Sequence, residues 1–170
     1  MKNVQEDLKS VVQEVVDLQH KANLVYGIKP DKPEPNPPAS DDEIEELKAE
    51  LKRRGLPLPP SYRQFLAVSN GIRAFIAELN LLSAKGVLQP VKEELEEDFP
   101  SLSRFVVANG NTSEFISLDP DTVDANGEME AVWMMEDGGE FRYANFATLL
   151  TSLRDQLRKT VKLAKADRKR

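Results

Sequence analysis

The chain has 170 residues, 40% of them hydrophobic and 31% charged, which is typical of a globular domain and unlike a disordered or membrane-embedded chain. It contains no cysteine, which excludes a disulfide framework and a cysteine-based zinc finger, and no apolar run approaches the ~18 residues that a membrane span needs. Because the first seven residues include the acids Glu6 and Asp7, where a signal peptide would be apolar, we expect a cytoplasmic protein without a membrane segment.

Charge is distributed unevenly along the chain, whose net charge is −6. Residues 31–150 include 23 acidic and 11 basic residues, a balance of −12, whereas residues 151–170 include eight basic and two acidic residues, a balance of +6. An acidic body repels nucleic acid and attracts basic proteins, so we expect a protein partner and no direct binding of nucleic acid. The basic end has two interpretations: a solvated helix terminus whose cations complement the helix dipole, or a contact surface.

Residues 1–28 are predicted to form an amphipathic helix. Its apolar residues recur at alternating spacings of four and three, which is a heptad-like stripe: Val4, Leu8, Val11, Val15, Leu18, Ala22 and Val25. Residues 29–39 form a proline-rich linker, with five prolines between Lys29 and Pro38, a density that is incompatible with helix or sheet. We therefore expect the first helix to be an appendage that docks on its own domain or, in a homodimer through the terminal helices, on a second copy.

Two helices open the main domain, which we expect to span residues 40–157. Ser40 and Glu43 form a capping box at the start of the first helix, and Gly55 ends it. Prolines between Leu56 and Pro60 force an extended link and favour a new helix start. The predicted buried faces are Ile44, Leu47 and Leu51 in the first helix, and Tyr62, Phe65 and Leu66 in the second.

Beyond Gly71 the hydrophobic period changes to that of strands. The run Ala74–Leu82 suits one strand. Four shorter apolar runs follow, separated by Asn-Gly and Asp-Gly turn signals, at residues 105–108, 115–118, 131–135 and 141–143. A final helix begins near Asn145, with a basic end at residues 158–170. The sequence thus predicts an α+β fold: a mostly antiparallel sheet of about five strands, packed with helices on one side, and an extra N-terminal helix.

The run Leu58–Leu66, which reads Leu-Pro-x-x-Tyr-x-x-Phe-Leu, and the following Asn70-Gly71 together resemble the opening signature of the SUKH superfamily. This superfamily includes the yeast cell-wall assembly regulators of the Smi and Knr type and many bacterial immunity proteins. The resemblance extends over about residues 41–157. Ile72 departs from the pattern, which often has a second glycine there.

The resemblance implies a SUKH-like domain that works by binding a partner. Bacterial members are thought to neutralise polymorphic toxins, often nucleases, by holding them in an inactive complex. We therefore expect an immunity-type protein whose partner is a basic toxin. The alternative is a scaffold or regulatory module of the Smi and Knr type that acts as a dimer.

The sequence contains few residues that are suitable for catalysis or metal binding. His20 is the one histidine, and neither a nucleophile nor a second metal ligand lies near it in sequence. The acidic segment Asp119–Glu128 resembles a calcium loop at first, but Val123 and Asp124 occupy positions at which an EF-hand needs an oxygen ligand and a glycine. We therefore expect no enzyme, no metal, no cofactor and no small-molecule substrate.

Two acidic stretches and one aromatic residue are candidates for contact with a partner. The loop that contains Asp119–Glu128 is either an acidic hairpin or a contact loop, and Trp133 is either a core residue or an interface anchor. The run Glu93–Asp98 is either a solvated acidic face or a mimic of a phosphate backbone. The predicted partner-binding residues are Asp119, Asp121, Asp124, Glu128, Trp133 and Asp137.

Overall fold

The computed structural model describes residues 7–27, 32–76 and 78–167. The predictions for Val4, for the first linker residues, for Ala77 and for the last three basic residues lie outside these ranges. The helices are α1 (Leu8–Val25), α2 (Asp41–Arg53), α3 (Pro60–Leu66), α4 (Ala84–Val87), α5 (Glu93–Asp98) and α6 (Phe146–Asp167), with 3-10 turns η1 (Leu102–Phe105) and η2 (Pro120–Thr122). The strands are β1 (Glu34–Pro35), β2 (Ile72–Ile76), β3 (Leu79–Leu81), β4 (Val106–Asn109), β5 (Phe115–Leu118), β6 (Ala131–Met134) and β7 (Glu140–Tyr143).

The strands form one antiparallel meander in chain order from β1 to β7, so the described residues contain a seven-stranded sheet and not the predicted sheet of about five strands. Two segments account for the difference. The run Ala74–Leu82 contributes to the hairpin of β2 and β3 and is not a single strand. Glu34–Pro35 of the proline-rich linker pairs with β2, which corrects the prediction that the linker is incompatible with a sheet. Proline is tolerated there because β1 is an edge strand, which pairs on one side only.

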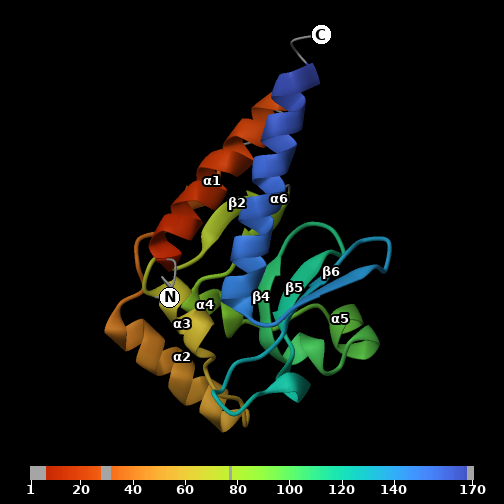
Figure 1. The fold of residues 1–170 in the computed structure, drawn as a ribbon. Coiled ribbons are helices and arrows are strands. Elements are labelled where there is room, and N and C mark those ends of the chain that lie inside the picture. Colours follow the sequence, from red (N-terminus) through yellow and green to blue (C-terminus); the bar gives the residue numbers. More distant parts are fainter. Residues whose placement is uncertain (1–6, 28–31, 77, 168–170) are drawn as a thin grey trace.

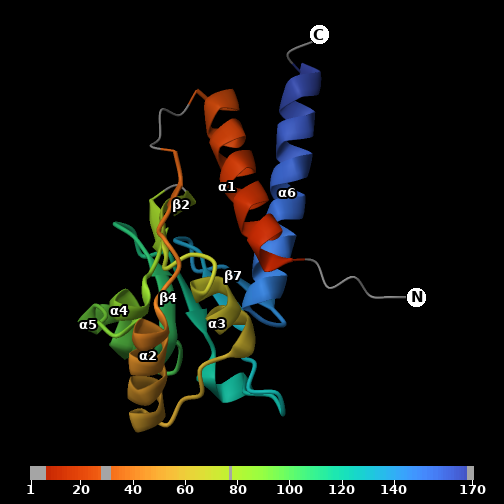
Figure 2. The same cartoon turned by 90° about the vertical axis from the view of Figure 1, so that its left-hand side faces the viewer.

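Both faces of the sheet are covered, which corrects the prediction of helices on one side. Along β6, Ala131 and Trp133 belong to the main core, whereas Val132 and Met134 belong to a smaller cluster on the other face. Helices α1, α3 and α6 pack on the main core, and α5 and η1 cover the smaller cluster. In Figure 2, α5 and α6 lie on opposite sides of β4.

Helix α1 docks on its own domain, the first of the two predicted alternatives. It lies beside α6, and the two helices run in the same direction (Figures 1 and 2). Its fully buried valines belong to the main core of the domain: Val11, Val12, Val15 and Val16. The Arg158 guanidinium of α6 donates to both carboxylate oxygens of Glu14, each at 2.7 Å, a bidentate pair that links the two helices. Helix α1 is therefore part of the packed unit within one chain.

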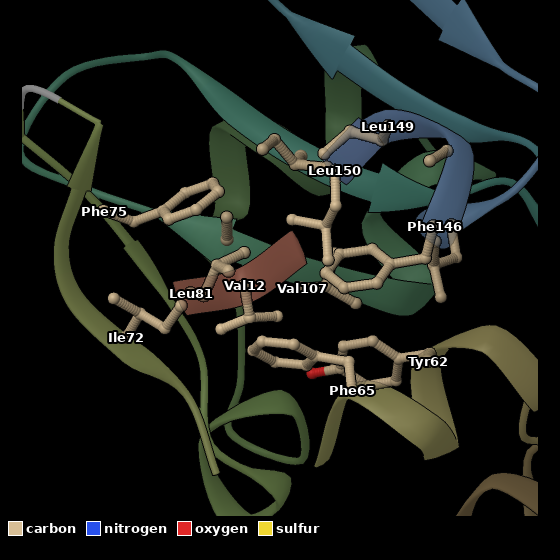
Figure 3. Close-up of a cluster of buried hydrophobic side chains, with 14 of the residues drawn as sticks. Val12, Tyr62, Phe65, Ile72, Phe75, Leu81, Val107, Phe146, Leu149 and Leu150 are labelled. Carbon is tan, nitrogen blue, oxygen red and sulfur yellow. The ribbon is translucent and has the colours of Figure 1, made fainter. Parts of the chain in front are cut away.

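The segment Leu58–Gly71 supplies the centre of the main core (Figure 3). The Tyr62 ring lies edge-on to Phe146, with ring centroids 5.0 Å apart, and to Phe105, at 5.9 Å. Phe65 approaches Phe146 at 5.1 Å. Tyr62 and Phe65 are fully buried, which confirms the prediction that they are packing residues. Burial also raises the pKa of Tyr62 above its ordinary value, so its hydroxyl stays protonated.

Asn70 and Gly71 join the linker, α3 and α4. The Asn70 side-chain oxygen accepts the backbone N–H of Ala84 at 2.8 Å, and the Asn70 carbonyl accepts the side-chain amide of Asn36 at 2.8 Å. Gly71 has a φ of +92°, and a Cβ there would lie 2.7 Å from the carbonyl oxygen of Leu81. Both its backbone conformation and this close approach therefore require glycine.

Candidate partner-binding surface

Helix α5 presents five acidic side chains within six residues, and all five are exposed. Leu95 faces inward, where it packs with Phe99 against the smaller core cluster. The Phe99 ring lies edge-on to Phe115, with ring centroids 5.5 Å apart. Apolar contacts thus hold the short helix on the sheet, while its acids point to solvent.

A groove of about 440 Å³ lies between α5 and the turn that joins β4 to β5. Its acidic lining consists of Glu94, Asp98, Glu114 and Glu136. Its apolar lining consists of Val91, Leu95, Phe99, Val106 and Phe115. Among the residues that line it, Lys92 is the one base. Such a groove suits lysine or arginine side chains, because the apolar lining contacts the aliphatic stem and the carboxylates attract the charged head.

Asp119, a predicted contact residue, is held inside the protein by a salt bridge. Its side chain is buried, and its carboxylate accepts a hydrogen bond from Arg142 at 2.9 Å. Arg142 also donates to Glu140 at 3.0 Å and to Glu130 at 2.9 Å. Its hydrogen bonds to Asp119, Glu140 and Glu130, in that order of effect, raise the pKa of Arg142 above its ordinary value. Asp119 thus ties the loop after β5 to strand β7.

The other acids of this loop also make hydrogen bonds within the protein. Asp121 accepts the hydroxyl of Ser101 at 2.6 Å, and Asp124 accepts two backbone N–H groups of its own turn at 2.8 and 2.9 Å. Glu128 accepts both the backbone N–H and the hydroxyl of Ser61, at 2.8 and 2.7 Å. Asp121 and Asp124 are exposed and Glu128 is half-buried, so the first two present the most charge to solvent.

Trp133 and Asp137 lie toward the other end of β6. Trp133 is 9% exposed and belongs to the main core, which bears out the core interpretation of this residue. Its indole N–H donates to Glu114, an acid of the groove, at 2.6 Å. Asp137 is exposed in the turn after β6 and accepts the backbone N–H of Gly139 at 2.9 Å.

The structure thus separates the predicted residues into two groups. The loop 119–128 follows β5, whereas Asp137 follows β6. Because adjacent antiparallel strands run in opposite directions, these two segments lie at opposite strand ends of the sheet. The groove lies at the same strand ends as Asp137, since Glu114 precedes β5 and Glu136 follows β6. Asp121 and Asp124 therefore lie away from the groove, and Asp137 lies next to one of its acids.

The sequence did not predict the groove. It predicted that Glu93–Asp98 is an acidic face or a phosphate mimic. The spacing of Leu95 and Phe99, four residues apart, indicates that this segment also has one buried helical face. No sequence pattern indicates that Glu114 and Glu136 lie close together, because only the pairing of β5 with β6 brings them to the same strand ends of the sheet.

Within the described part of the chain, other features of chemical interest are few. His20 lies on α1, and its buried Nδ1 atom has no hydrogen-bond partner there. Across residues 7–27, 32–76 and 78–167, no three histidine, aspartate or glutamate side chains gather closely enough to hold a metal ion. None of the helices in these ranges combines the length and apolar character needed to cross a membrane.

Comparison with known proteins identifies the family of this chain. No curated protein matches the chain. The model of the SMI1 / KNR4 family (SUKH-1) matches residues 38–152, which is more than half of the 170 residues. The match includes the signature segment Leu58–Gly71 and strands β2 to β7, and it leaves out α1 and β1. The chain therefore belongs to the SMI1 / KNR4 family (SUKH-1), which confirms the resemblance predicted from its signature.

Proposed function

We propose that this protein is a non-catalytic binding protein of the immunity type, which neutralises a basic toxin by holding it in an inactive complex. The observation that carries the proposal is the groove beside α5, where four carboxylates surround an apolar lining. Membership of a family that is shared with immunity proteins supports the same reading. Toxins that act on nucleic acid are usually basic, so the charge of the groove suits a nuclease toxin in particular.

The acidic surface supports rapid and selective association. Opposite charges accelerate the encounter of two proteins and disfavour wrong partners, and salt screens this effect. The charge balance of −12 over residues 31–150 provides the long-range attraction. The exposed acids of α5 provide a local site at which a basic segment can be held.

The apolar lining supports a contact that outlasts the encounter. Val91, Leu95 and Phe99 are half-buried, so part of each side chain is available for a partner to cover. Tight interfaces concentrate binding energy in a few desolvated apolar contacts surrounded by polar groups. We therefore place the contact at the groove and not in the loop 119–128, whose acids are largely engaged in hydrogen bonds within the domain.

The experiment uses the product of a toxin gene adjacent to the gene of this protein. Stopped-flow association is measured for the wild type and for a double variant, Glu94→Gln with Asp98→Asn, at low and high salt. We expect the double variant to associate about tenfold more slowly at low salt and to show a weaker salt dependence. Its ability to protect cells from the toxin should fall in parallel.

The matched control is Glu45→Gln with Glu46→Gln, which removes the same charge from the exposed face of α2. We expect this control to associate at nearly the wild-type rate. Equal slowing in the two double variants would assign the effect to net charge and would contradict a role for the groove. A toxin that remains fully active in the presence of excess wild-type protein would contradict the proposed function itself.

A second candidate function, a dimeric scaffold or regulatory module, is supported by a different surface. Leu24, Tyr26 and Leu163 are 57%, 65% and 67% exposed, and they lie near the carboxyl ends of α1 and α6, which project beyond the sheet (Figure 1). If these side chains form a dimer contact, light scattering should show a dimer that Leu24→Glu with Leu163→Glu converts to a monomer. Val123→Glu, at another exposed apolar residue, is the control. A monomeric wild-type protein would contradict this candidate.

A further inference from the structure

We propose that a second cavity, between the ends of α2 and α4 on one side and α5 and η1 on the other, is a binding site for a small organic anion. Its ligand would be a carboxylate or phosphate group attached to an apolar body. The cavity has a volume of about 540 Å³, within the range of about 300–1,000 Å³ that is typical of ligand pockets. It is distinct from the acidic groove, although Pro90 and Val91 line both.

Two arginines from distant parts of the sequence, Arg54 and Arg104, line this cavity. Arg104 donates to the backbone carbonyl of Arg54 at 3.4 Å. Arg54 in turn donates to the backbone carbonyl of Leu88 at 3.2 Å and to the carboxylate of Glu50 at 2.9 Å. Each arginine is thus oriented by the end of a neighbouring helix, and the pair is preorganised before any ligand binds.

Donors remain for a ligand. A guanidinium has five N–H donors, and within the described residues the Arg104 guanidinium makes one hydrogen bond and no ion pair. Planar, paired donors of this kind match the oxygen atoms of a carboxylate or a phosphate. Ser103 and Gln89 also line the cavity. The Ser103 hydroxyl donates to the carbonyl of Pro100 at 3.2 Å, whereas the Gln89 amide donates one N–H to the carbonyl of Lys85 at 3.4 Å and keeps a second.

Charge and polarity define the ligand class. The ionised residues that line the cavity are Arg54, Arg104 and Glu96, so the lining carries a balance of +1 within a segment whose balance is −12. Glu96, Arg54 and Arg104 are all exposed, so solvent screens the repulsion by Glu96 as well as the attraction by the two arginines. The apolar lining, which includes Leu56, Val87, Leu88 and Val91, favours a ligand with an apolar portion over inorganic phosphate alone.

The test is an NMR titration of the isolated full-length protein with phenyl phosphate, benzoate, inorganic phosphate and benzylamine. We expect saturable shifts, with midpoints in the low millimolar range or below, in the amide signals of Leu88, Gln89, Ser103 and Arg104. Phenyl phosphate and benzoate should bind at least about tenfold more tightly than benzylamine, which presents the same ring with the opposite charge. The relative affinities of phenyl phosphate and benzoate identify which head group the cavity prefers.

Variants separate a ligand site from a purely structural role of the two arginines. Arg104→Gln removes one guanidinium, and Gln89→Glu adds a repulsive charge at an exposed position that supports neither arginine. Each should weaken phenyl phosphate about tenfold, or about 1.4 kcal/mol. Arg63→Gln changes an exposed arginine of α3 that does not line the cavity and should leave the affinity unchanged.

Several results would overturn the proposal. Absence of saturable shifts at the cavity, equal binding of benzylamine, or an unchanged affinity in Gln89→Glu would each leave the arginines as caps of helix ends only. If Arg104→Gln fails to fold, the Gln89→Glu variant still decides the outcome. No toxin is present in this titration, so its result is independent of the proposed function.

Discussion

Glu128 caps helix α3 from a loop 67 positions away, since its carboxylate accepts the backbone N–H of Ser61 at 2.8 Å and the Ser61 hydroxyl at 2.7 Å. The N-cap residue of this helix is Pro59, which makes no side-chain capping hydrogen bond. The first turn of a helix has N–H groups without partners inside the helix. A carboxylate that is distant in sequence therefore replaces the missing local cap, and the acidic loop 119–128 stabilises the fold.

Replacing Glu128 with alanine should lower the free energy of unfolding. The variant leaves the N–H and hydroxyl of Ser61 without their acceptor, so we expect a loss of about 1–2 kcal/mol in urea denaturation. Glu46→Ala on α2 is the control, because Glu46 is exposed, and it should change the stability by less than about 0.5 kcal/mol. An equal loss in the two variants would contradict the capping role.

Two glycines with similar backbone conformations should respond very differently to alanine. Gly71 and Gly127 have φ values of +92° and +78°, so each substitution incurs backbone strain of about 1–2 kcal/mol. A Cβ at Gly71 would also lie 2.7 Å from a backbone oxygen, whereas nothing lies within 4 Å at Gly127. We expect Gly71→Ala to cost about 3 kcal/mol or more, or to prevent folding, in the same denaturation experiment. Similar losses at the two positions would show that the close approach at Gly71 relaxes without cost.

Helix α1 should unfold together with the rest of the domain. Val15 is completely buried in the main core, so Val15→Ala should cost about 2 kcal/mol, while Leu24→Ala, at a mostly exposed position, should cost little. Unfolding followed by Trp133 fluorescence and by helical circular dichroism should give one coincident transition. A Trp133 transition that is unaffected by Val15→Ala would show that α1 is a separate unit.

The capping box of α2 should make part of the stability dependent on pH. The backbone N–H of Ser40 donates to the Glu43 carboxylate at 2.9 Å, and this hydrogen bond lowers the pKa of Glu43 below its ordinary value of 4.5. Because the folded carboxyl binds a proton less readily than the unfolded one, the stabilisation is complete above the unfolded pKa and is lost as the pH falls through the folded pKa.

Glu43→Gln tests this dependence, since glutamine keeps a hydrogen-bond acceptor at the position and removes the charge. The difference in unfolding free energy between the wild type and the variant should be largest near neutral pH and should vanish in acid. An NMR titration of the Glu43 carboxyl gives the folded pKa directly. A difference that stays constant with pH, or a pKa at or above 4.5, would contradict the expectation.

Features that depend on neighbouring residues could be predicted from the sequence. The capping box at Ser40 and Glu43, the helix that contains Tyr62 and Phe65, and the last four strands all occur as predicted. A cap or a tight turn is decided by the conformations of a few consecutive residues, and an alternating or helical apolar pattern shows which side will be buried. The same local pattern carries the family signature Leu58–Gly71.

Features that depend on distant segments could not be predicted. Proline density in the linker argues against a strand, yet β1 forms because an edge of β2 is available to pair with it. Heptad-like spacing in α1 suits a second copy as well as α6, and only the packed domain shows that the valines reach the main core of their own chain.

The candidate surfaces show the same division. Residue order alone shows that the body is acidic, that the segment of α5 concentrates negative charge, and that the chain carries the signature of the SMI1 / KNR4 family. The packed fold is needed to show that Asp119 and Glu128 accept hydrogen bonds within the domain, that Glu114 and Glu136 join α5 around one groove, and that Arg54 and Arg104 line one cavity. The physical reason is that charge and periodicity are properties of the local chain, whereas a site is an arrangement of side chains that meet only when strands and helices pack.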